Sequence, residues 1–146
     1  MRLVITSDTH GRHDLIKDLP AGDVFVHAGD FMNYGLHPEE IISFNRWLAK
    51  QPIAHKVVCG GNHDRLFQLS RLTSRDLLND ATYLENTGVT IGGISFLGSP
   101  YTPEFLNCVI DGLIAVIAGH HNLHVVVEAG CSQTLEIGER GRVREW

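Results

Sequence analysis

The stretch KVVCGGNHD, residues 56–64, places two glycines and three polar side chains directly after a short apolar run. The run reads as a buried strand, and Gly60-Gly61 lets the backbone turn sharply and approach a ligand closely. The residues that follow, Asn62-His63-Asp64, carry oxygen and nitrogen donors of the kind that hold metals and phosphates. The pattern predicts a functional turn at the carboxyl end of a strand.

Two earlier strands end in the same way. The stretch LVITSDTH ends in Asp8 and His10, and VFVHAGD ends in Asp30. Apolar strands that alternate with helices are typical of a parallel sheet covered by helices. Ligands of such sheets collect beyond the carboxyl ends of the strands, which is where these side chains and Asn62 fall.

The helices are predicted between these strands. A helix begins at Pro38, a favoured first helical position, and ends before Pro52, with Ile41, Phe44 and Leu48 on one face. A brief helix within residues 11–19 takes Asp14 as its N-cap, and residues 65–78 form a helical connection that Asp64 caps.

Further strands are expected in the second half of the chain. Residues 82–85, 89–91 and 94–97 read as strands, and Gly92-Gly93 marks a hairpin at which the sheet becomes antiparallel. The run 109–118 fits a strand or a short helix. The later segments read as two strands and a charged tail, at 123–127, 134–137 and 138–146.

Composition is that of an ordinary globular protein. The 146 residues are 43% hydrophobic and 20% charged, which predicts one domain spanning residues 1–146. A net charge of -5 argues against long nucleic acid as an obligate partner. It leaves room for a small phosphorylated substrate, since bound cations can supply positive charge.

Cysteine usage and hydropathy favour the cytoplasm. Cys59, Cys108 and Cys131 are odd in number and lack C-x-x-C spacing, which fits free thiols in a reducing compartment. The apolar run at the N-terminus is too short for a signal peptide, and the run 109–118 contains Asp111 and Gly112. No membrane segment is expected.

The polar residues at the strand ends suit a metal centre. Asp8 and His10 lie on one side of the chain if the segment is extended, and together can grip one cation. Asp30 can bridge two cations, and Asn62 offers a carbonyl oxygen to the second. His63 would face the substrate as a general acid or as a donor to developing charge.

The ordered motifs DTH, GD and GNHD resemble those of the calcineurin-like metallophosphoesterases, and their context is similar to a compact phosphodiesterase-type branch of that family. The resemblance covers residues 1 to about 105. It implies an α/β fold, a β-sandwich flanked by helices, and two divalent cations: manganese first, with iron, zinc, nickel or magnesium as alternatives. It assigns Asp8 and His10 to the first metal, Asp30 to the bridge, Asn62 to the second metal and catalysis to His63.

The last third of the chain departs from the family pattern. Family members carry a His-Gly-Pro motif and a later Gly-His-x-His, and neither is intact here. Gly119-His120 is followed two positions on by Asn122, and His121 and His124 have different spacing. Residues 107–146 therefore read as truncated, diverged or shifted in frame, which predicts an abbreviated second half of the sandwich.

Three functional hypotheses follow. The first is hydrolysis of a phosphodiester, such as a cyclic nucleotide, or of a phosphomonoester, by water activated between two metals. The second is a non-catalytic descendant that binds a nucleotide or a protein. The third is a homo-oligomer in which another subunit covers an exposed sheet face.

The remaining polar and aromatic residues have simpler interpretations. His27 lies inside an apolar strand and is expected to be a hydrogen-bonded core histidine. His13, His37 and His55 are expected at the surface, and Trp47 in the core. Asn33 and Tyr34 follow Asp30 and can line a substrate pocket or make the turn before the helix; the turn is favoured.

Overall fold

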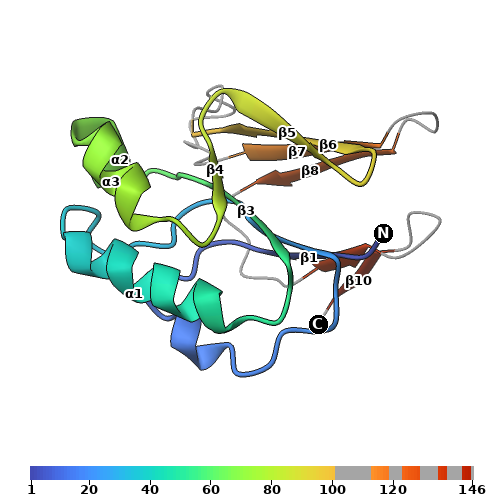
Figure 1. The fold of residues 1–146 in the computed structure, drawn as a ribbon, viewed down its shortest axis with the longest axis horizontal. Coiled ribbons are helices and arrows are strands. Elements are labelled where there is room, and N and C mark those ends of the chain that lie inside the picture. The colour runs from blue at the N-terminus through green and yellow to red at the C-terminus, as the bar shows by residue number, and fades with distance from the viewer. Residues whose placement is uncertain (101–112, 119–122, 129–134, 138–142, 146) are drawn as a thin grey trace, which may run out of the picture.

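The computed structural model describes residues 1–100 and, beyond them, residues 113–118, 123–128, 135–137 and 143–145. These residues form two sheets (Figure 1). The strands of the six-stranded sheet, in spatial order, are β10 (Val143–Glu145), β9 (Leu135–Ile137), β1 (Leu3–Thr6), β2 (Val24–His27), β3 (His55–Cys59) and β4 (Thr82–Leu84). Those of the four-stranded sheet are β5 (Thr87–Ile91), β6 (Ile94–Ser99), β7 (Leu113–Ala118) and β8 (Leu123–Glu128).

The six-stranded sheet has the parallel arrangement that the sequence predicts. β1, β2, β3 and β4 run parallel to their neighbours, whereas β9 is antiparallel to β1 and β10 to β9. The four-stranded sheet is antiparallel throughout, and its first hairpin turns at Gly92-Gly93, both of which have positive φ. The predicted change of topology at this hairpin is confirmed.

β1 and β2 are buried on both faces along their whole length, as is the apolar end of β3, which explains their apolar sequences. Alternate residues of β1, such as Leu3 and Ile5, face β6 of the second sheet, where Phe96 lies in the same apolar cluster. The residue between them, Val4, packs with the helices on the opposite face. The mixed α/β architecture with a parallel sheet and helices is confirmed.

The described helices lie on one side of the sandwich (Figure 1). α1 (Pro38–Lys50) buries Ile41, Phe44 and Leu48 against the six-stranded sheet, as its apolar periodicity predicts, and also buries Trp47. The short 3-10 helix η1 (His13–Leu15) precedes β2. The connection between β3 and β4 forms two helices, α2 (Leu66–Leu69) and α3 (Arg71–Leu77), which meet at the non-helical Ser70.

Some local predictions were wrong. Asp14 lies inside η1, where Arg12 is the N-cap residue. His13 is buried because its ring packs beside Phe44 and Trp47 of α1. The charged tail contains β10, which pairs with β9 at the sheet edge. Both His13 and β10 depend on partners distant in sequence, so local composition does not reveal them. His37 and His55 are exposed, as predicted.

His27 lies at the centre of the aromatic layer between β2 and α1. Its ring packs against Phe31 and Phe44, while its Nε2 lies 3.1 Å from Thr9 Oγ1 and its Nδ1 accepts a hydrogen bond from Gly29 N. The prediction of a hydrogen-bonded core histidine is confirmed. Burial lowers its pKa from 6.5 to about 3, and the nearby His13 and His10 act in the same direction.

This burial predicts that acid destabilises the protein through His27. The unfolded chain takes up a proton at this ring below about pH 6.5, but the folded chain does so only near pH 3, so the free energy of unfolding falls as pH drops through this window. From pH 6.5 to pH 5 the loss is about 2 kcal/mol. Urea unfolding of His27→Gln at several pH values should give a flatter dependence than wild type. His55→Gln, at an exposed strand position, should keep the wild-type slope, and a wild-type slope in His27→Gln would contradict this explanation.

Candidate metal centre

The carboxyl ends of β1, β2 and β3 bring the predicted site residues to one edge of the sheet. The loops after β1 and β2 are joined by backbone hydrogen bonds, since Asp8 N donates to Gly29 O and His10 N donates to Asp30 O, each at 3.0 Å. The loop after β3 joins them where His63 N donates to Asp30 Oδ1 at 2.8 Å. Three segments separated in sequence therefore form one rigid rim.

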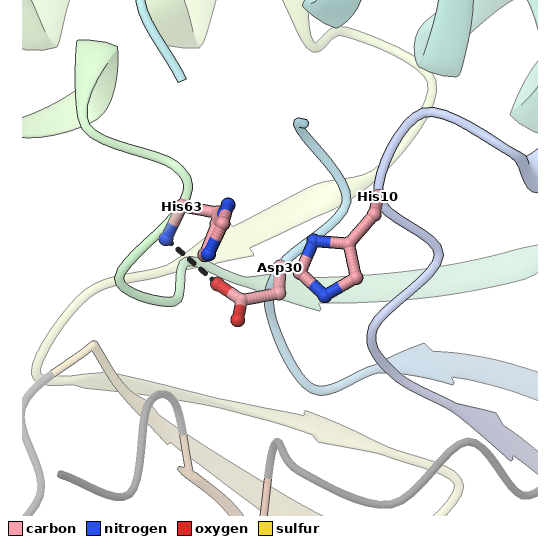
Figure 2. A group of neighbouring side chains, drawn as sticks. All are labelled: His10, Asp30 and His63. Carbon is pink, nitrogen blue, oxygen red and sulfur yellow. Dashed lines mark hydrogen bonds between the residues drawn. The ribbon is translucent and has the colours of Figure 1, made fainter. Parts of the chain in front are cut away.

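The side chains of His10, Asp30 and His63 converge at this rim (Figure 2). One donor atom from each lies within 4.8 Å of the other two, which is close enough for all three to reach a common ion. The two imidazoles meet edge to face with their centroids 4.6 Å apart. Asp8 lies next to this group, with its Oδ1 at 3.8 Å from His10 Nε2.

The structure brings some of the predicted site residues into one cluster and leaves others outside it. Asp8, His10 and Asp30 lie together, and His63, expected to face the substrate, is grouped with His10 and Asp30. The Asn62 side chain is exposed on the same turn. His120 and His121 lie outside the described residues.

The backbone at the site is strained. Asp8, His10 and Asp30 have φ values of 54°, 42° and 56°, in the left-handed region that residues with a Cβ rarely adopt. The expectation that residues 8–10 are extended was therefore wrong: the chain bends sharply at each of these positions. Strain of this kind concentrates at functional sites, where the surrounding structure holds it in place.

Gly61 allows the turn after β3 to approach Asp30. A Cβ at position 61 would overlap the Asp30 carboxylate and backbone nitrogen. Gly29, with φ of 117°, lies against the same turn. The sequence predicted that Gly60-Gly61 lets the backbone approach a ligand; the close contact that the structure shows at Gly61 is with the carboxylate of Asp30.

Asp64 ties the loops together. Its buried carboxylate accepts hydrogen bonds from the backbone nitrogens of Asp30, Met32 and Gly61 at 2.8, 2.9 and 2.8 Å. Burial raises its pKa to about 8, although the three N–H donors act in the opposite direction. The prediction that Asp64 caps the next helix was wrong, because Arg65 is the N-cap residue of α2. Asp64 is structural, as predicted, but it holds the backbone of Asp30, which lies 34 residues earlier in the sequence.

His63 is also held through its ring. Its Nδ1 lies 2.9 Å from the backbone carbonyl of Asn33 in the loop before α1. A carbonyl only accepts, so Nδ1 carries the hydrogen and Nε2 remains to act in the cluster. Asn33 and Tyr34 lie in the turn before the helix, as favoured from sequence. No sequence signal marks the carbonyl, because every residue has one.

The Asp30 carboxyl lies in a partly desolvated position beside two imidazoles. Burial raises the pKa of Asp30 above its ordinary value, opposed by the hydrogen bond from His63 N and by the neighbouring imidazoles. A carboxylate and two imidazoles on a rigid backbone form a donor set that suits divalent transition metals. The residues present therefore fit the metal that the sequence motifs imply.

Comparison with known proteins identifies the family. A family model for calcineurin-like phosphoesterases matches residues 1–137, and the chain belongs to this family. Metallophosphoesterase domain-containing protein 1 of Homo sapiens is 37% identical over 127 residues, which cover 71% of this chain and 38% of the human protein. The protein of the same name from Mus musculus matches equally. A UPF0046 protein of Caenorhabditis elegans is 37% identical over 117 residues, covering 70% of this chain and 40% of that protein.

These relatives are considerably longer than this chain, which spans 38% of the human protein. Members of the family typically bind divalent metals, and the donor atoms of His10, Asp30 and His63 lie close enough together to hold one ion. Among the helices that the structure describes, none has the length and apolar character needed to cross a bilayer.

The strained backbone predicts that a glycine at position 10 stabilises the fold. His10 is only partly buried and has φ of 42°, and a left-handed residue costs about 1 kcal/mol that glycine avoids. His10→Gly should therefore raise the free energy of urea unfolding by about 1 kcal/mol. The matched His55→Gly, in strand β3, should lower it by a similar amount. Equal losses in both variants would show that the His10 backbone stores no strain.

Proposed function

We propose that this chain is a metal-dependent phosphoesterase that hydrolyses phosphodiesters, such as cyclic nucleotides, or phosphomonoesters. The observation that carries the proposal is the convergence of His10, Asp30 and His63 at one sheet edge, where His10 and Asp30 lie on strained backbone. Family membership supports a hydrolase. Because the chain spans only part of its relatives, its activity is inferred from its own site.

The proposed centre holds two divalent cations, with manganese as the first candidate. Asp8 and His10 would hold one, Asp30 would supply a carboxylate oxygen to each, and Asn62 would offer its carbonyl oxygen to the other. Bound cations would lower the pKa of a water and neutralise charge on the phosphoryl group. The protein fixes the donors: backbone hydrogen bonds hold Asp8 to Gly29 and His10 to Asp30.

His63 is proposed to transfer a proton at Nε2. Its Nδ1–H donates to Asn33 O, so protonation of Nε2 gives a ring in which one hydrogen is held by the protein and the other faces the cluster. The Asn33 carbonyl stabilises this protonated ring by accepting from it. The Nε2 proton then passes to the oxygen that leaves phosphorus.

The first test measures bound metal. Wild type purified in manganese-supplemented buffer should hold about two ions per chain by elemental analysis, as a two-metal site requires. Asp30→Asn should lose them, because the amide carries no charge and presents one oxygen in place of two. Asp76→Asn, exposed on α3, is the control and should keep the wild-type content.

Other metal contents decide between the hypotheses. One ion per chain in wild type would remove the second cation from the proposal. Two ions without hydrolysis of an aryl phosphodiester would favour the non-catalytic alternative.

The second test separates catalysis by His63 from metal binding. His63→Asn should lower kcat for an aryl phosphodiester by about 100- to 10,000-fold, the range for loss of a general acid, with metal content unchanged. A fall in metal content in His63→Asn would instead make this residue a ligand, as its position beside His10 and Asp30 also permits.

A further inference from the structure

Glu40 reaches out of helix α1 to the loop before it. It lies in the first turn, and its Oε2 accepts hydrogen bonds from the backbone nitrogens of Asn33 at 2.5 Å and Tyr34 at 3.1 Å. Its other carboxylate oxygen, Oε1, is buried and has no hydrogen-bond partner among the described residues. The carboxylate therefore holds two consecutive N–H groups of a loop that lies six and seven residues earlier in sequence.

That loop is the one that holds His63. Asn33 O lies 2.9 Å from His63 Nδ1. Gly35, with φ of 76°, lies so close to the His63 carbonyl that a Cβ at position 35 would overlap it. The loop and the His63 turn are thus in direct backbone contact.

The geometry of one peptide group links Glu40 to His63. The Asn33 carbonyl and the Tyr34 N–H belong to the same planar trans peptide, so they point in opposite directions. By holding the Tyr34 N–H, Glu40 directs the Asn33 carbonyl away from α1 and toward His63.

Phe31 and Met32 of this loop are buried in the core, but the Asn33–Tyr34 peptide that follows them has little side-chain packing around it. Tyr34 is 72% exposed, and Asn33 is also exposed. Hydrogen bonds between a carboxylate and backbone N–H groups are among the stronger ones in proteins. The hydrogen bonds from Asn33 N and Tyr34 N to Glu40 are therefore well suited to fixing the orientation of the Asn33–Tyr34 peptide.

We propose that Glu40 is a positioning residue for His63. It orients the Asn33–Tyr34 peptide so that the carbonyl holds the hydrogen on His63 Nδ1, which leaves Nε2 directed at His10 and Asp30. The effect on catalysis rests on the proposed function, but the effect on the His63 ring does not.

The test reads the tautomer of His63 directly. The full chain is labelled with ¹⁵N-histidine, and long-range proton–nitrogen spectra are recorded without added metal at pH 8, where an ordinary imidazole is neutral. Loss of signals in His63→Asn assigns the ring. In wild type, Nδ1 should carry the hydrogen.

Glu40→Ala should mix the two tautomers, so that the shifts of His63 Nδ1 and Nε2 move toward each other. The matched control is Glu39→Ala, which removes a charge from the same first turn and should leave the wild-type spectrum. Glu40→Gln keeps the shape of the side chain and weakens both hydrogen bonds. It should shift the signals less, in the same direction, and serves if Glu40→Ala does not fold.

A hydrogen on Nε2 in wild type, or an unchanged His63 spectrum in the folded Glu40 variants, would overturn the proposal.

In manganese-supplemented buffer, Glu40→Ala should also lower kcat by about 10- to 100-fold, the range for loss of an outer-shell partner, with metal content unchanged. Absence of hydrolysis in wild type would count against the proposed function, whereas the tautomer would still decide the role of Glu40.

Discussion

Three backbone N–H groups from two loops donate hydrogen bonds to the buried carboxylate of Asp64. Two belong to the loop after β2, at Asp30 and Met32, and the third is that of Gly61 after β3. A buried N–H without an acceptor is costly, so the carboxylate satisfies donors that irregular loops would otherwise leave unpaired. It also sets the spacing between Asp30 and the turn that carries His63, on which the rest of the cluster depends.

The rim around this carboxylate is built from backbone conformations that a relaxed chain would avoid. Left-handed φ values at Asp8, His10 and Asp30 turn the chain sharply at the ends of β1 and β2. The parallel sheet supports this strain because β1, β2 and the carboxyl end of β3 are buried on both faces and held in register. A rigid sheet edge therefore presents donors at fixed separations, as selective metal binding requires.

Much of the architecture follows from local sequence signals. The helix at Pro38, its buried face and the hairpin at Gly92-Gly93 were predicted from periodicity, capping and turn chemistry, and the structure has them. The strand that β10 forms, the burial of His13 and the action of Asp64 were not predicted. Each depends on a partner far away in sequence, which local patterns do not specify.

The sequence by itself determined which chemical groups this protein brings to the ends of its strands. Apolar runs define β1, β2 and β3, and the donors Asp8, His10, Asp30 and His63 follow them in an order typical of the family. Only the tertiary structure decided how those groups face one another. The left-handed bends, the grouping of His63 with His10 and Asp30, and the carbonyl that holds the His63 ring all arise from backbone contacts between loops. Backbone atoms are the same in every residue, so local sequence does not reveal contacts of this kind, and the fold selects them by bringing each N–H and carbonyl to a partner.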